Sequence, residues 1–168
     1  MIRLATKDDI PQIVWCDRTS VSDIEVVGYG LPSGKRVFAN EEKLRANWHE
    51  AYVEGRVVYV FEEDHHVLGF TQIRIDPDAV ELYDIDVAGE HQGKGIGRAL
   101  VDFVENLARN LGKHYVTLGT SRNIKTGKPW KSYDFWLKLG YMLDGETETE
   151  EDKTNGFTEI RFRKKVLN

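Results

Sequence analysis

Three glycines alternate with other residues in the stretch Gln92–Gly97, QGKGIG, directly before a long run of apolar residues with helical spacing. Glycine turns that lead into a helix expose backbone N–H groups, and these groups bind phosphate at the positive end of the helix. A Walker A loop needs Ser or Thr after its Gly-Lys pair, and none of the four Gly-Lys pairs in the chain has one. The dinucleotide fingerprint fails too, because its last position falls on Arg98 or Leu100. The stretch therefore predicts a pyrophosphate-binding turn of another kind.

Three acidic residues, Glu81, Asp84 and Asp86, lie on the strand predicted just before this turn. Carboxylates on a central strand are costly to bury unless they are paired or take part in proton transfer. Strict alternation along the strand predicts Glu81 on one face and Asp84 with Asp86 on the other. We interpret Glu81 or Asp84 as the candidate base. The alternative is that one or two of the three acids only bond loop backbone or bind a cationic substrate.

The elements that must position these residues follow from the apolar periodicity and from turn residues. Thr6 followed by Asp9 is a variant of the capping box, and Gly112 and Gly140 stand where helices commonly end. The mixed order of elements predicts an α/β (α+β) fold with a mixed central sheet and helices on both faces. Strands are predicted over residues 2–5, 56–61, 67–75, 80–87, 115–118, 141–143 and 157–166, and helices after Thr6 and over 41–52, 96–111 and 132–139.

The composition bounds the class of protein. The 168 residues are 40% hydrophobic and 30% charged, which suits a single globular domain over residues 1–168. The net charge of −5 argues against nucleic acid and mildly favours a cationic partner. Cys16 is the one cysteine, and no apolar run approaches the roughly 20 residues that cross a bilayer. With no secretory signal in the sequence, we expect a cytoplasmic protein that binds no membrane.

The turn resembles a known family. Gln92–Gly97 matches Q/R-x-x-G-x-G/A, the pyrophosphate loop of the GCN5-related N-acetyltransferase (GNAT) family. Phe135–Tyr141, FWLKLGY, is similar to the family segment F-Y-x-K-x-G-F. The resemblance implies the acyl-CoA N-acyltransferase fold and the transfer of an acetyl group from acetyl-CoA to a primary amine in a ternary complex. The acceptor would be a small cationic amine, a polyamine or a protein amino group.

The resemblance also implies where the coenzyme lies. Acetyl-CoA would sit between two splayed parallel strands, over residues 81–87 and 115–119, with its pyrophosphate on the glycine turn. The family often places Asn three residues before a small residue, here Ser132, but Pro129 stands there and Asn123 lies upstream of a local insertion. The implied coenzyme-binding residues are Ile85, Asp86, Val87, Gln92, Gly93, Lys94, Gly95, Ile96, Gly97, Arg98, Asn123 and Trp136.

Catalysis needs a base for the ammonium and a donor for the oxyanion, and it gains from an acid for the thiolate. Glu81 resembles the position of the catalytic glutamate of the histone acetyltransferase branch, and Asp84 is the second candidate base. The backbone N–H of Val87 is the oxyanion donor that the resemblance implies. The usual family tyrosine falls at Trp136, whose indole cannot supply a proton near neutral pH, so Tyr133 is the candidate acid.

Other interpretations stay open. The loss of the family tyrosine favours a sensor domain that binds acyl-CoA with little or no turnover. Residues 144–152 are rich in acids, and they are either a solvated loop or a rim that attracts a cationic amine. Aromatic residues of the 21–38 loop are candidates to wall the acceptor site. We expect no metal, because the pair His65-His66 has no third spaced ligand, and we treat a homodimer as possible.

Overall fold

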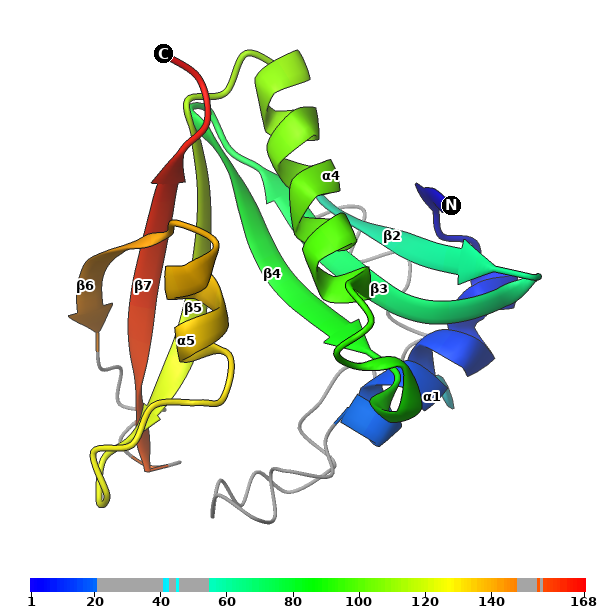
Figure 1. Ribbon diagram of the computed structural model, residues 1–168, viewed down its shortest axis with the longest axis horizontal. Coiled ribbons are helices and arrows are strands. Elements are labelled where there is room, and N and C mark those ends of the chain that lie inside the picture. Colours follow the sequence, from blue (N-terminus) through cyan, green and yellow to red (C-terminus); the bar gives the residue numbers. More distant parts are fainter. Residues whose placement is uncertain (21–40, 43–44, 46–54, 148–153, 155) are drawn as a thin grey trace.

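The computed structural model describes residues 1–20, 41–42, 45, 55–147, 154 and 156–168. Within these residues, seven strands form one sheet in the order β1-β2-β3-β4-β5-β7-β6 (Figure 1). The predicted mixed sheet is confirmed, because β4 and β5 pair in parallel and the other neighbours are antiparallel. The strands are β1 (Ile2–Leu4), β2 (Arg56–Glu63), β3 (His66–Ile75), β4 (Ala79–Val87), β5 (Tyr115–Asn123), β6 (Met142–Thr147) and β7 (Phe157–Lys165).

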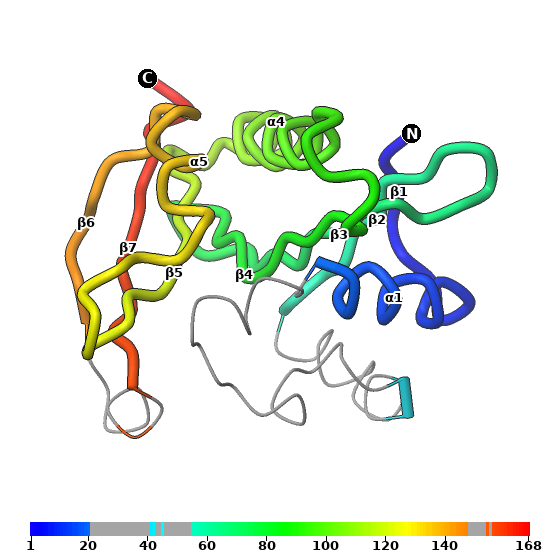
Figure 2. The backbone as a smooth tube through the Cα atoms, turned by 60° about the horizontal axis from the view of Figure 1, so that its bottom comes forward, coloured from blue at the N-terminus to red at the C-terminus, as the bar shows by residue number. Residues whose placement is uncertain are grey.

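Helices cover both faces of the sheet, as the sequence predicts (Figure 2). The helices α4 (Ile96–Asn110) and α5 (Tyr133–Lys138) lie on one face, and α1 (Ile10–Ser20) lies on the other. Two short 3-10 helices, η1 (Lys7–Asp9) and η4 (Gly89–His91), precede α1 and the glycine turn. None of the described helices is long and apolar enough to span a membrane. The predicted helix over 41–52 and the loop over 21–38 fall largely or wholly outside the described residues.

The ends of the elements show why these residues form them. The predicted capping box of Thr6 and Asp9 is confirmed, and within it the Asp9 carboxylate accepts the Thr6 N–H at 2.7 Å. Asp64 and His65 both have positive φ, as a two-residue hairpin turn between twisted strands requires. Gly112 has φ 69° and donates to the Arg109 carbonyl, so α4 ends in the left-handed turn that the sequence predicts.

The core lies mainly between the sheet and α4. The buried face of α4 carries Ile96, Leu100, Val101, Val104 and Ala108. These side chains pack against apolar residues of β3, β4 and β5, so α4 begins at a fixed place beside the end of β4. The glycine turn, which enters α4, is positioned by this packing.

The sheet splits between its two parallel strands. β4 and β5 pair only from Ala79 with Tyr115 to Leu82 with Leu118. Beyond that point β4 continues beside β3 as far as Val87, and β5 continues beside β7 as far as Asn123. The predicted splay is therefore confirmed, and β5 extends five residues past the predicted strand end at Leu118.

A β-bulge on β4 changes which face its acids share. Leu82 is opposite Ile73 and Asp84 is opposite Gln72, so Tyr83 is an extra residue in β4. As a result Leu82 and Ile85 both pack in the core on the α4 side. Glu81 precedes Leu82 in the strand and therefore faces away from α4. Asp84 and Asp86 flank Ile85 and therefore face away from α4 as well. The prediction that Glu81 lies on the opposite face from Asp84 and Asp86 is wrong, because strict alternation does not continue through a bulge.

Candidate active site

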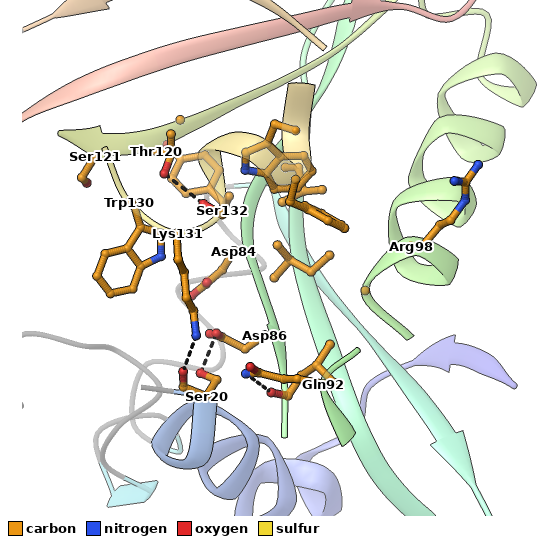
Figure 3. Close-up of a pocket in the computed structure, with 18 of the residues that line it drawn as sticks. Ser20, Asp84, Asp86, Gln92, Arg98, Thr120, Ser121, Trp130, Lys131 and Ser132 are labelled. Carbon is orange, nitrogen blue, oxygen red and sulfur yellow. Dashed lines mark hydrogen bonds between the residues drawn. The ribbon is translucent and has the colours of Figure 1, made fainter. Parts of the chain in front are cut away.

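A cavity of about 680 Å³ opens where β4 and β5 separate (Figure 3). One wall is formed by β4 from Leu82 to Val87 and by the glycine turn. The other wall is formed by β5 from Gly119 to Ser121, by the segment Trp130–Ser132 and by Phe135 and Trp136 of α5. The cavity therefore follows directly from the loss of pairing between the two parallel strands.

The edge of β4 presents backbone polar groups to this cavity. The Ala88 N–H donates to the Leu68 carbonyl at 2.9 Å, so even-numbered residues at this end of β4 point their backbone groups at β3. The N–H and C=O of Ile85 and Val87 then point the other way, into the gap. The Val87 carbonyl accepts a hydrogen bond from the Gln92 side chain at 3.0 Å, in agreement with this direction. An extended ligand in the gap would restore the bonds that a neighbouring strand makes elsewhere.

The glycines of the turn contribute in two different ways. Gly93 and Gly95 have φ values of 76° and 90°, a conformation that other residues adopt at a cost, and Gly95 caps α4. Gly97 instead leaves the cavity wall open, and only a side chain longer than that of alanine would obstruct it. A Cβ built on it would lie 3.7 Å from Val87 and 3.8 Å from Phe135, which is ordinary contact, and anything larger would enter the cavity. The turn thus exposes backbone N–H groups beside open space.

Ten of the sequence-predicted site residues line the cavity and five do not. The lining set is Asp84, Ile85, Asp86, Val87, Gln92, Gly93, Gly95, Gly97, Arg98 and Trp136. The residues outside the lining are Glu81, Lys94, Ile96, Asn123 and Tyr133.

Glu81 is held in an ion-pair network in the closed part of the sheet. Its two carboxylate oxygens accept hydrogen bonds from Arg74 and Arg161, each at 2.8 Å, and its side chain is 11% exposed. It is opposite Thr117 of β5, where the parallel strands are still paired. Because both oxygens are engaged and the strands close over this position, Glu81 is not among the groups that face the cavity.

Asp84 and Asp86 occupy the open part of β4. The Asp86 carboxylate accepts a hydrogen bond from the Ser20 hydroxyl, at the end of α1, at 2.6 Å. Asp84 lies opposite Gln72, two residues closer to the point where the strands separate, and its side chain lines the cavity. Of the two candidate bases, Asp84 is therefore the one that lines the cavity, and it lies just beyond the fork of the sheet.

The two aromatic candidates on α5 differ in direction. The ring of Tyr133 packs edge-on against Phe162 of β7, with ring centroids 5.4 Å apart, and the Arg122 guanidinium lies 5.9 Å from its centroid. Trp136 is 3% exposed and lies in the cavity wall, edge-on to Phe135 and Tyr141. The helix therefore turns the indole toward the cavity and the phenol toward the sheet.

The remaining residues outside the lining have local roles. The Asn123 side chain accepts the Thr126 N–H at 3.0 Å and so stabilises the turn after β5. Ile96 is buried in the core with Leu68 and Leu100. Lys94 is exposed at the tip of the glycine turn. Arg98 is a lining residue, but its side chain points away from the other labelled groups and lies 3.6 Å from Asp102 (Figure 3).

Several polar lining residues were not predicted from sequence. Ser20 comes from α1, and Thr120 and Ser121 come from the part of β5 beyond its predicted end. The Thr120 hydroxyl lies 3.1 Å from that of Ser132. No periodicity or motif marks these residues, because the split of the sheet brings them to the cavity. Within the part of the chain that the structure describes, no group of three or more His, Cys, Asp or Glu side chains could hold a metal ion.

Comparisons with known proteins agree with this geometry. An uncharacterized N-acetyltransferase of Halalkalibacterium halodurans is 36% identical over 64 residues, which are 38% of this chain, and the match spans only 30% of that protein's length. A putative GNAT-family acetyltransferase of Desulfovibrio desulfuricans has a TM-score of 0.76 at 20% identity, with 99% of both chains covered. The PaiA N-acetyltransferase of Thermoplasma acidophilum, solved with coenzyme A, has a TM-score of 0.73 at 17% identity, with 98% of both chains covered.

The two structural likenesses show the fold, since their identities are low. Membership of a family is shown by sequence. The sequence model of the acetyltransferase (GNAT) family aligns with residues 21–141, which are most of the chain. That segment contains the split strands, the glycine turn, α4 and α5. The chain therefore belongs to the acetyltransferase (GNAT) family.

Proposed function

We propose that this protein transfers an acetyl group from acetyl-CoA to a primary amine by direct attack in a ternary complex. The observation that carries the proposal is the edge of β4, where the N–H and C=O of Ile85 and Val87 point into a cavity beside a glycine turn at the start of a helix. Such an edge suits the amides of a pantetheine arm, and such a turn suits a pyrophosphate. Coenzyme A in the solved PaiA structure supports the same ligand class here.

The proposed coenzyme site runs along one side of the split. The turn from Gln92 to Arg98 would hold the pyrophosphate, with Lys94 and Arg98 adding charge. The thioester would then lie near the fork of β4 and β5. The Ile85 N–H also faces the gap and lies two residues nearer the fork than the Val87 N–H that the resemblance implies, so Ile85 is the proposed donor to the oxyanion that forms when the amine nitrogen bonds to the carbonyl carbon.

Asp84 is the proposed base. A primary amine with a pKa near about 10 is mostly protonated at neutral pH, so a carboxylate or a water bound to it must take a proton before or during the attack. Asp84 lines the cavity close to the fork, whereas Glu81 lies outside the lining, in the part of the sheet where β4 and β5 are still paired. Both Asp84 and Asp86 would also attract a cationic acceptor to the α1 side of the sheet.

The thiolate would leave without direct help from Tyr133. The C–S bond breaks as the tetrahedral intermediate collapses, and a thiol with a pKa near about 8.5 is a tolerable leaving group without a protein acid. Tyr133 packs on Phe162, and Trp136 takes its place in the cavity wall. We therefore propose that water protonates the thiolate and that Trp136 shapes the cavity.

The test is the release of free thiol from acetyl-CoA in the presence of polyamines, aminoglycosides, amino acids and N-terminal peptides. Gly97→Trp would fill the space between Val87 and Phe135, and we expect it to abolish coenzyme binding and thiol release. Gly97→Ala is the matched control, because its Cβ makes only ordinary contacts, and it should keep both. A protein that binds no coenzyme A in calorimetry, or whose thiol release is the same in both variants, would contradict the proposal.

A second candidate function is suggested by Trp136, which replaces a side chain able to donate a proton. A domain of this kind could bind acetyl-CoA as a sensor without turnover. Tight coenzyme binding with no thiol release from any amine class would favour the sensor over the enzyme.

A further inference from the structure

The open end of the split sheet has two sides that belong to different parts of the chain. One side is β4 with α1, which packs against β3 and β4 through the core cluster of Ile13, Val14 and Phe70. The other side is β5 with the segment that follows it and α5. The two sides meet in the closed part of the sheet, up to Leu82 and Leu118, and separate beyond it.

A chain of hydrogen bonds crosses this open end (Figure 3). Lys131, just before α5, donates from Nζ to the backbone carbonyl of Ser20 at 3.2 Å. Ser20 is the last residue of α1, and its hydroxyl donates to Asp86 of β4 at 2.6 Å. A lysine at the carbonyl end of a helix is favourable, because the last carbonyls lack partners and carry the negative end of the helix dipole.

Each end of this series of hydrogen bonds is held in place by further backbone contacts on its own side of the split sheet. After β4 diverges, the vacated edge of β5 pairs with the returning chain, because the Trp130 N–H donates to Ser121 at 2.8 Å and the Asn123 N–H donates to Lys128 at 2.9 Å. Lys131 follows directly and so has a defined starting point. On the other side, the Gly89 N–H donates to the Thr19 hydroxyl at 3.1 Å.

The last turn of α1 also closely approaches η4, the short helix that precedes the glycine turn. A Cβ on Gly89 would lie 2.7 Å from the Thr19 carbonyl oxygen, so a side chain there would push the two segments apart. Gly89 begins η4, which leads directly to Gln92. The end of α1 therefore contacts β4, the η4 helix that leads into the glycine turn, and Lys131.

We propose that Lys131 is a positioning residue for the acetyl transfer, which sets the width of the cavity by tying the β5–α5 side to the end of α1. The catalytic consequence of this inference rests on the proposed function. The hydrogen bond from Lys131 to Ser20, called the tie below, does not. The coenzyme would be held mainly by β4 and the glycine turn, while Phe135 and Trp136 close the cavity from the other side. A wider gap would leave the thioester less well confined, and small errors of placement cost catalysis heavily.

The kinetic test compares Lys131→Met, which keeps an unbranched side chain of nearly the same length but removes its charge and its donor, with Lys131→Arg. Lys131 is exposed to solvent, which weakens its bond to Ser20, so we expect Lys131→Met to lower kcat/KM for acetyl-CoA by only about three- to tenfold, mainly through KM. Lys131→Arg should restore at least half of the loss, since it can still donate to the Ser20 carbonyl. Lys125→Met, an exposed lysine in the same hairpin, is the matched control and should behave as the wild type. Equal kinetics in Lys131→Met and wild type would overturn the proposal.

A direct bond from Lys131 to the coenzyme is distinguished by the ligand. If Lys131 contacts the ribose 3′-phosphate, Lys131→Met should weaken binding of coenzyme A but not of 3′-dephospho-coenzyme A in calorimetry. The tie predicts the same loss for both ligands, and a loss confined to coenzyme A would overturn it.

The tie itself is tested without any reaction. Spin labels on Glu90→Cys and Lys125→Cys report the distance across the opening, because Cys16 is buried and escapes labelling. We expect Lys131→Met to broaden and lengthen the distance distribution, and Lys131→Arg to leave it narrow. An unchanged distribution in Lys131→Met would overturn the tie. If the distribution broadens in a protein with no activity and no coenzyme binding, the proposed function fails and the tie stands.

Discussion

The assignment of Asp84 rather than Glu81 as the base makes a prediction that separates stability from catalysis. Glu81 accepts two charge-assisted hydrogen bonds at 2.8 Å, from Arg74 and Arg161, and is itself nearly buried. Hydrogen bonds to charged groups contribute about 1.5–3 kcal/mol each. The two arginines are 37% and 28% exposed, so water screens both pairs and places each at the lower end.

Glu81→Gln keeps one acceptor oxygen and turns an amide N–H₂ toward the second arginine. We therefore expect the free energy of unfolding to fall by about 2 kcal/mol, which lowers Tm by about 4–8 °C for a domain of this size. Below that temperature, kcat should stay within about threefold of wild type, because the side chain lies outside the cavity. Thermal and urea unfolding measure the first effect, and thiol release under saturating substrates measures the second.

The matched variants define the comparison. Asp84→Asn should lower kcat by about a hundred- to ten-thousandfold at temperatures where the variant is folded. Glu159→Gln removes the other carboxylate bonded to Arg161, and because Glu159 is 40% exposed its cost should stay below about 1 kcal/mol. A Glu81→Gln protein with wild-type stability and a hundredfold loss of kcat would refute the reasoning and return the base role to Glu81.

Three further predictions concern buried groups. The pKa of Asp9 is held below its usual range, chiefly by two hydrogen bonds from the Arg3 guanidinium and then by the N–H and hydroxyl of Thr6. The ionised Asp9 therefore stabilises the fold at neutral pH. This contribution to the free energy of unfolding is lost as pH falls through the lowered pKa. Arg3→Met should therefore show a smaller drop in unfolding free energy between about pH 7 and about pH 2, measured by urea titration. Burial, with the nearby charge of Asp86, raises the pKa of the Cys16 thiol to about 12, so a thiol reagent should react at least about a hundredfold more slowly with the folded protein than with the urea-unfolded chain. The Tyr141 hydroxyl is buried near the Glu105 carboxylate but makes no well-aligned hydrogen bond among the described residues, and Tyr141→Phe should leave stability unchanged or raise it by up to about 1 kcal/mol, whereas a loss of more than that would show that the bond to Glu105 forms.

The sequence by itself determined the parts of this protein that depend on local physics. The alternating glycines of residues 93–97 stand where a positive φ or open space is needed, and the 3.6-residue apolar period of α4 follows immediately, so the turn and the helix are both predictable. The strands were predictable from their local apolar patterns and the turn residues between them. The mixed order of strands and helices then predicted a mixed sheet with helices on both faces, as observed. The capping pair of Thr6 and Asp9 and the end of α4 at Gly112 are likewise local.

Only the tertiary structure decided which of the candidate side chains meet at the cavity. The bulge at Tyr83 put Glu81, Asp84 and Asp86 on one face, and the arginines that engage Glu81 come from β3 and from β7, 7 and 80 residues away in sequence. Tyr133 and Trp136 are neighbours on α5, yet packing against Phe162 turns one to the sheet and leaves the other in the cavity wall. Ser20 and Lys131 are 111 residues apart and meet across the split. These choices depend on strand register and on long-range contacts, which no local pattern of residues encodes.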